Sequence, residues 1–260
     1  MEELKDTQNE PDFRNLAIDR VGVKNLRFPV DVREKSGGTQ STVATVSLAV
    51  DLPHHYKGTH MSRFVEVLNS HGPVLDVKSL PRIPSELQAR LDAQRSHIEF
   101  RFPFFLSKAA PVTGAQGLVD YDVVFEIDSK EDVQDFILTV CVPVTTLCPC
   151  SKAISARGAH NQRGQVTFSV RFNEPVWIED LIALVEKCAS CELYSLLKRP
   201  DEKEVTERAY DHPVFVEDLV RNVAALSDEQ ENITWYRVEA ENFESIHNHN
   251  AYAVIEKAGA

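Results

Sequence analysis

The sequence has no long apolar run, no surplus of positive charge and no even set of cysteines. None of its segments reaches the about 18 consecutive apolar residues that a membrane-spanning helix needs. The first residues, Met1 to Gln8, are polar and acidic and do not have the apolar core of a signal peptide. We therefore expect a cytoplasmic protein with no membrane segment.

The net charge limits which ligands we expect, and the number of cysteines limits which roles the cysteines can have. A formal net charge of -12 leaves no broad basic surface for duplex nucleic acid, so we expect no nucleic-acid partner. A polyphosphate remains an acceptable ligand, because a few Arg, Lys and His side chains can gather in one pocket. The 5 cysteines are an odd number, and in a reducing compartment they are metal ligands, catalytic thiols or buried residues.

Hydrophobic periodicity predicts strands and helices in a repeated order. Apolar residues alternate with polar ones in the strand segments, whereas they recur at helical spacing in the helix segments. In the first half the segments are strands at 21–32 and 42–50, helices at 60–68 and 85–94, and strands at 97–106 and 118–127. In the second half they are strands at 135–145 and 164–172, helices at 178–197 and 214–226, and strands at 233–240 and 251–255.

This repetition predicts an α+β protein of two similar modules, each an antiparallel sheet with helices on one face. The predicted organisation is a polar N-terminal segment at 1–18, a first module at 19–131 and a second module at 132–260. A single mixed domain without internal symmetry is the open alternative.

The second module contains the residue types that most often bind metals or transfer protons. Cys148 and Cys150 begin a long polar connection between two predicted strands, and His160 follows in the same connection. His247 and His249 lie two positions apart near the end of the sequence, so in an extended segment both imidazoles point the same way. A thiolate and several imidazoles together can bind a transition metal and can also transfer protons.

A second cysteine pair has a different interpretation. Cys188 and Cys191 have the spacing of a zinc half-site, but they continue the apolar stripe of the predicted helix at 178–197. Free cysteine is among the most buried residue types, so core packing is the favoured interpretation. Cys141, inside an apolar strand, is assigned to the core for the same reason.

Several motifs together resemble GTP cyclohydrolase I of the prokaryotic type IB. They occur in the family's order, and the resemblance extends from about residue 20 to the end of the sequence. The motifs are Gly58–Phe64, Cys148–Lys152, Gly158–Arg163, Leu197–Glu202, Val205–Glu207 and Ser245–His249.

The resemblance implies a fold and a reaction. The fold is the tunnelling fold, with tandem β-β-α-α-β-β modules whose sheets join between subunits into an oligomeric barrel, as a homotetramer with sites shared between subunits. The reaction hydrolyses GTP at C8 of the purine, releases formate and closes the opened ribose into 7,8-dihydroneopterin triphosphate. This is the first step of folate biosynthesis.

The resemblance also implies a metal set of Cys148, His160 and Glu202. These sulfur, nitrogen and oxygen ligands suit zinc, and the carboxylate also permits manganese or iron(II). The third ligand stays open among neighbouring carboxylates, which are Asp201, Glu204 and Glu207.

Further roles follow from the same resemblance. Cys150, His247 and His249 are the expected proton donors and acceptors at the purine and the ribose. Glu217 is expected to accept hydrogen bonds from the guanine N1–H and exocyclic amine, which adenine cannot supply in that pattern. The residues expected to bind other parts of the substrate, including its phosphates, are His60, Ser62, Arg63 and Lys152.

Two alternatives belong to other classes of protein. One is a related tunnelling-fold nitrile reductase, which uses a cysteine nucleophile and NADPH. The other is a non-catalytic assembly protein with a structural zinc site made of Cys148, Cys150, Cys188 and Cys191.

Overall fold

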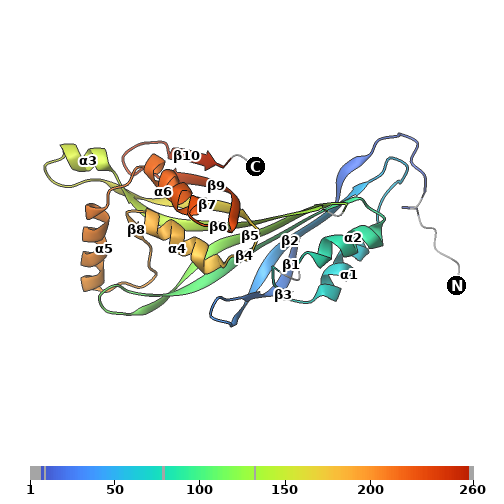
Figure 1. Ribbon diagram of the computed structural model, residues 1–260, viewed down its shortest axis with the longest axis horizontal. Coiled ribbons are helices and arrows are strands. Elements are labelled where there is room, and N and C mark those ends of the chain that lie inside the picture. Colours follow the sequence, from blue (N-terminus) through green and yellow to red (C-terminus); the bar gives the residue numbers. More distant parts are fainter. Residues whose placement is uncertain (1–6, 9, 78–79, 132, 258–260) are drawn as a thin grey trace. The chain divides into compact units, whose positions relative to one another are not determined.

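The structure is a computed structural model, and it describes residues 7–8, 10–77, 80–131 and 133–257. The described residues form ten strands and six helices. The chain forms two compact units. The first contains residues 1–102 and 124–137, and the second contains residues 103–123 and 138–260. Each unit is described separately below, with elements labelled as in Figure 1.

The first unit follows the predicted order of two strands, two helices and two strands. Strands β1 (Ile18–Arg33) and β2 (Thr39–Leu52) pair antiparallel and are followed by helix α1 (Met61–His71). A short strand, β3 (Val74–Leu75), pairs parallel to β1 and precedes helix α2 (Arg82–Leu91). The unit is completed by parts of β4 (Arg95–Ala109), β5 (Gln116–Lys130) and β6 (Val133–Leu147).

Alternation along the strands explains why this sheet has one covered face. In β2, Ala44, Val46, Leu48 and Val50 are almost fully buried, while the residues between them are partly exposed. Helices α1 and α2 supply buried side chains of their own, including Phe64 and Leu87. This core confirms an antiparallel sheet with helices on one face.

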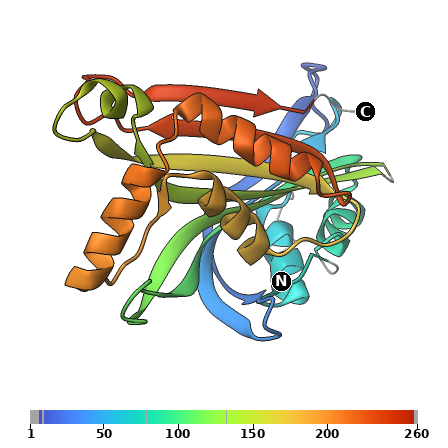
Figure 2. The same cartoon turned by 60° about the vertical axis from the view of Figure 1, so that its left-hand side comes forward.

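The second unit repeats the order with additions. After β6 come helix α3 (Pro149–Ile154) and β7 (Asn161–Phe172), followed by helix α4 (Ile178–Cys188) and a two-residue strand, β8 (Cys191–Glu192). Helices α5 (Arg199–Asp211) and α6 (Val216–Asp228) then lead to β9 (Ile233–Asn242) and β10 (Ala251–Glu256). Figure 2 shows α6 lying along the strands β9 and β10.

Hydrogen bonding links the strands in the order β10-β9-β7-β6-β5-β4-β2-β1-β3, with β8 paired to β6. The predicted mixed α+β class with antiparallel sheets is therefore confirmed. Among the described helices, none has the length and apolar character that crossing a membrane requires.

Three details differ from the sequence-based expectation. The helix predicted at 178–197 ends at Cys188, because the chain turns there and pairs with β6 as β8. Helix α5 was not predicted, since only Asp201 and Ala209 are buried in it and it has no apolar stripe. The segment with His247 and His249 is bent, whereas an extended conformation was expected.

Candidate active site

A pocket of about 270 Å³ opens in the second unit where the ends of β6, β7 and β9 meet the start of α6. Five of the residues predicted from the sequence line it: Cys148, His160, Glu217, His247 and His249. Its other lining residues are Gln162, Val214, Phe215, Val216, Asn242, Glu244 and Ala251. Four separate stretches of the sequence therefore meet at one cavity.

Cys148 is held by the turn that joins β6 to α3. It is the N-cap of α3 and has extended backbone angles, and Pro149 occupies the first helical position. The Cys148 sulfur accepts a hydrogen bond from the Ser151 N–H at 3.4 Å. The Cys148 N–H donates to the His160 carbonyl oxygen at 3.1 Å. This bond joins the two ends of the polar connection, so the thiol and the imidazole come from neighbouring backbone.

His160 is a half-buried side chain with several polar neighbours. Its Nδ1 lies 3.0 Å from Gln162 Oε1 and 3.5 Å from Ser245 Oγ. A Glu244 carboxylate oxygen lies 4.0 Å from the same nitrogen. Because these contacts all involve Nδ1, the other ring nitrogen, Nε2, is left for a ligand.

His247 and His249 stack on one another at the rim of the pocket. Their ring centroids are 5.1 Å apart and the rings are 20° from parallel. Both side chains are exposed, and they belong to the bent segment between β9 and β10. The two imidazoles are therefore together, as the spacing predicted, although the backbone is bent.

Glu217 lies in the first turn of α6 and its exposed side chain lines the pocket. Its carboxylate forms no hydrogen bond or ion pair with another residue in the described part of the chain. Acidic side chains are favourable at this end of a helix, where backbone N–H groups are unpaired. The carboxylate is thus available to a ligand.

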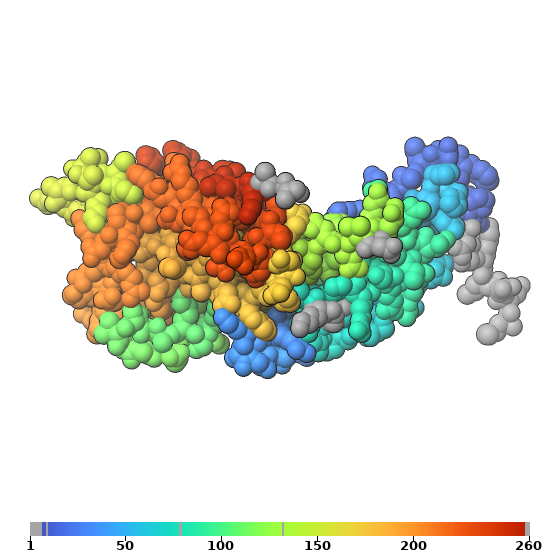
Figure 3. Space-filling view, viewed as in Figure 1, coloured from blue at the N-terminus to red at the C-terminus, as the bar shows by residue number. Residues whose placement is uncertain are grey.

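The other predicted site residues lie outside this pocket. Cys150 is exposed on α3, which lies on the surface in Figure 3. Lys152 donates to the Tyr210 carbonyl oxygen, with its ammonium 4.3 Å from the centre of the Tyr210 ring. Residues His60, Ser62 and Arg63 belong to the first unit, at the start of α1.

Glu202 lines a separate, open depression on α5 together with Arg199, Lys203, Thr206 and Glu207. Its carboxylate forms no hydrogen bond or ion pair with another described side chain, whereas the neighbouring carboxylates of Glu204 and Glu207 form ion pairs. Glu204 pairs with Arg208 at 3.3 Å, and Glu207 pairs with Lys203 at 2.6 Å.

Asp201 is fully buried and has a structural role. Its carboxylate accepts hydrogen bonds from the Val112 and Thr113 N–H groups, the Thr113 hydroxyl and the Lys198 N–H, at 2.7 to 2.9 Å. Burial by itself would raise the pKa of Asp201, but these bonds hold it below its usual range. Asp201 fastens α5 to the β4–β5 turn and is not free to bind a metal.

Comparison with known proteins identifies the family. The family model for type I GTP cyclohydrolase FolE2 matches residues 4–253. The chain belongs to this family. It is 68% identical over 260 residues to a GTP cyclohydrolase FolE2 of Akkermansia muciniphila, with 99% of this chain and 98% of the relative covered. It is 56% identical to a GTP cyclohydrolase FolE2 of Methylobacillus flagellatus, with 98% and 96% covered.

Solved structures of a similar fold are uricases. The uricase of Arthrobacter globiformis has a TM-score of 0.55 and 9% identity, with 93% of this chain and 94% of that chain covered. A highly active mutant of the Bacillus sp. TB-90 urate oxidase has a TM-score of 0.50 and 7% identity, with 92% and 99% covered. These likenesses confirm the tunnelling fold predicted for the FolE2 family.

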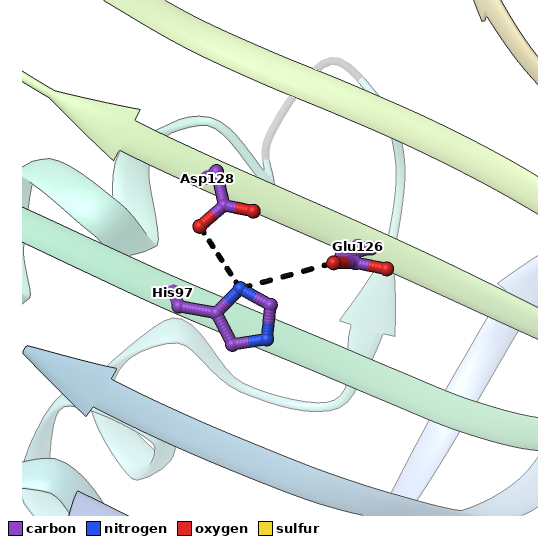
Figure 4. A group of neighbouring side chains, drawn as sticks. All are labelled: His97, Glu126 and Asp128. Carbon is purple, nitrogen blue, oxygen red and sulfur yellow. Dashed lines mark hydrogen bonds and ion pairs between the residues drawn. The ribbon is translucent and has the colours of Figure 1, made fainter. Parts of the chain in front are cut away.

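Among the described residues, the group of three side chains that lies close enough to hold a metal ion by spacing does not include Cys148 or His160. His97 on β4 lies between Asp128 and Glu126 on β5, with Nδ1 to carboxylate distances of 3.0 and 4.0 Å (Figure 4). Arg20 also contacts the Asp128 oxygen, at 3.1 Å. The group is therefore a candidate metal site by spacing, and its Asp128 carboxylate also has Arg20 as a partner.

The alternative zinc site of four cysteines is wrong. Cys188 and Cys191 are buried, and they do not line the pocket that contains Cys148. Cys188 donates to the Leu184 carbonyl oxygen at 3.2 Å, and burial raises the pKa of Cys188 to about 11 and that of Cys191 to about 12. Both thiols are core residues, as the sequence favoured.

Three polar residues of the pocket were not predicted as site residues: Gln162, Asn242 and Glu244. Gln162 lies inside the motif Gly158–Arg163 and Glu244 next to the motif Ser245–His249, but a sequence does not show which side chains turn toward a site. Asn242 is 3% exposed, and its buried Oδ1 has no hydrogen-bond partner among the described residues. An unpaired buried oxygen is costly in an apolar interior, so it points to a polar ligand in this pocket.

Proposed function

We propose that this chain is a GTP cyclohydrolase that converts GTP and water into formate and 7,8-dihydroneopterin triphosphate, at the entry to folate biosynthesis. The observation that carries the proposal is the convergence of Cys148, His160, Glu217, His247 and His249 on one cavity, in a member of the FolE2 family. The related nitrile reductase is not supported, because the family model and the near-full-length relatives are those of a cyclohydrolase.

The donor atoms that line this pocket suit a divalent metal. Cys148 offers sulfur, His160 offers the nitrogen Nε2, and a carboxylate can complete a site that keeps an open position. When bound, such a metal supplies a Lewis acid next to the purine C8. The mixed ligand set suits zinc, manganese or iron(II).

Two carboxylates are candidates for the third ligand. Glu244 lines the same pocket as Cys148 and His160, and its side chain is 11% exposed. Glu202 is the family-based candidate, but in this chain it lines the depression on α5. Substitution of each by glutamine, followed by a metal titration, separates the two.

The imidazoles supply protons during the reaction. Opening of the purine ring breaks carbon–nitrogen bonds at C8, and the departing nitrogens must gain protons. His247 and His249 lie at the rim, where their side chains can exchange protons with both water and substrate. Imidazole titrates near neutral pH, which suits it to both directions of transfer. Cys150 is a further candidate for the proton transfer at the purine.

Glu217 accounts for the choice of purine. Its free carboxylate can accept two hydrogen bonds from the N1–H and amino group of guanine. Adenine has no N1–H, so it would leave the carboxylate partly unpaired, and a site built for a donor strongly rejects a ligand that lacks it. GTP is therefore the proposed substrate.

The pocket in one chain is smaller than most ligand sites, which measure about 300–1,000 Å³. It also does not include Lys152, nor His60, Ser62 and Arg63, the proposed triphosphate ligands. A homotetramer with sites completed by a neighbouring subunit is consistent with both facts. We place the protein in the cytoplasm, where GTP is available.

Incubation with GTP and Mn²⁺ or Zn²⁺ tests the proposal. Formate release and the fluorescent pterin formed after oxidation are followed for the wild type, Cys148→Ala and Cys141→Ser. The last is a matched control, because Cys141 lies on β6, the strand that leads to Cys148, but outside the pocket. We expect product from the wild type and Cys141→Ser only. A folded wild-type protein that forms no product with any divalent metal would refute the proposal.

A further inference from the structure

Gln162 is the polar side chain that connects the pocket to the sheet. It is the second residue of β7 and only 8% exposed. Its amide lies between Thr146 on β6 and the imidazole of His160, and it contacts both.

The Gln162 amide bridges Thr146 and His160. The two residues are direct partners in the β6–β7 ladder, and Thr146 is fully buried. Gln162 Nε2 donates to Thr146 Oγ1 at 2.9 Å. With Nε2 on Thr146, the amide oxygen, Oε1, faces His160 Nδ1 at 3.0 Å.

The orientation determines the tautomer of His160. An amide oxygen only accepts hydrogen bonds, so Nδ1 must carry the proton and Nε2 must carry the free electron pair. The reversed amide would instead place the proton on Nε2 and prevent that nitrogen from binding a metal. Glu244, 4.0 Å from Nδ1, adds a negative charge that favours the proton on the same nitrogen.

We propose that Gln162 is a positioning residue that holds His160 with Nε2 free and directed at the metal. The inference rests on the proposed function, because it takes the Cys148 and His160 pair as metal ligands. Ligating histidines commonly donate their other N–H to such an acceptor, and loss of the acceptor costs about 10–100-fold in metal affinity.

The test compares three substitutions by metal affinity of the metal-free protein. Gln162→Met keeps the side-chain length but removes the acceptor. Gln162→Glu keeps an acceptor for Nδ1–H, and the Thr146 hydroxyl can rotate to donate to it. Gln165→Met is the matched control, because Gln165 lies three positions along β7 on its opposite face.

Zn²⁺ and Mn²⁺ affinities are measured by competition with a chromophoric chelator, and Co²⁺ absorption reports whether the Cys148 sulfur is bound. We expect about 10–100-fold weaker binding for Gln162→Met. Gln162→Glu should restore most of the affinity, and Gln165→Met should match the wild type. At saturation, Gln162→Met should still show the sulfur-to-cobalt band, because Cys148 remains in place.

Two further variants separate this inference from the proposed site. If Cys148→Ala and His160→Ala bind metal as tightly as the wild type, the metal site itself is wrong. If both lose the metal but Gln162→Met binds it with wild-type affinity, only the positioning role is overturned. Weak binding by both Gln162→Glu and Gln162→Met would also overturn it, since a preserved acceptor would then make no difference.

Discussion

Gly164 lies directly opposite Asn242 in the β7–β9 ladder, and a Cβ atom at position 164 would fall 2.6 Å from the Asn242 Oδ1. The same atom would lie 3.3 Å from the Glu241 carbonyl oxygen. Glycine is therefore required here by close approach, and not by its backbone angles. The open space above Gly164 is what allows the buried Asn242 side chain to line the pocket.

Gly164→Ala should displace the Asn242 side chain. Overpacking a buried position costs about 1–3 kcal/mol, so a lower free energy of unfolding is expected, together with weaker binding of GTP. Denaturant unfolding and substrate titration measure the two effects. Gly164→Ala combined with Asn242→Ala removes the clash, and it should recover stability but not GTP binding. Recovery of neither property would show that the clash is with the backbone at Glu241.

Lys108 and Glu186 form a largely buried ion pair in the second unit. Their charged atoms are 2.7 Å apart, with side chains 13% and 15% exposed, and the Tyr121 hydroxyl donates to the same carboxylate oxygen at 2.7 Å. Burial, followed by the nearby Glu186 charge, raises the pKa of Tyr121 above its usual range. Tyr121 is therefore a neutral donor at all ordinary pH values.

Lys108→Met should leave the Glu186 charge buried without its partner. Removal of one member of a buried pair costs about 3–5 kcal/mol, so we expect a loss of that size in the free energy of unfolding. Glu186→Gln in the same background removes the unpaired charge and should recover part of it. Urea denaturation of the single and double variants provides the measurement, and equal stability of Lys108→Met and wild type would contradict the prediction.

Sequence periodicity predicted much of this fold because burial on one face of a strand has a period of two residues. Strand β2 alternates so regularly that its predicted range, 42–50, lies within the observed strand. Helix α5 was missed for the opposite reason, since it is held by the Asp201 hydrogen bonds and the Glu192–Arg208 pair, and not by an apolar face. Such long-range polar contacts leave no periodic signal.

The candidate site was predictable where its motifs carry unusual residue types. Cysteine and histidine are rare enough to draw attention, so Cys148, His160, His247 and His249 were found. Gln162 and Asn242 are common polar residues, and their importance depends on which side chains the β6–β7–β9 register places beside them. A single sequence does not contain that register.

The cysteines should differ sharply in reactivity. Cys150 is exposed, whereas Cys188 and Cys191 are buried with pKa values raised to about 11 and about 12. Because the thiolate is the reactive form, iodoacetamide at pH 8 should label Cys150 and spare the other two in the folded protein. Peptide mass spectrometry reads the labelled positions, and denatured protein shows that every cysteine can react. Labelling of Cys191 at the rate of Cys150 would contradict the buried assignment.

Because of Asp201, the free energy of unfolding of the second unit should fall at low pH. The folded pKa of Asp201 is lowered, so this residue stabilises the fold fully above the unfolded aspartate pKa of about 4, and that contribution is lost as the pH falls toward the folded value.

Asp201→Asn removes this titration. The variant should be less stable than the wild type at pH 7, and the difference should shrink as the pH is lowered below about 4. Asp218→Asn, at a partly exposed carboxylate on α6, is the control and should change stability at pH 7 far less. A constant non-zero difference between Asp201→Asn and wild type from pH 7 to pH 3 would contradict the prediction, because the lost stability would then not depend on the charge of Asp201.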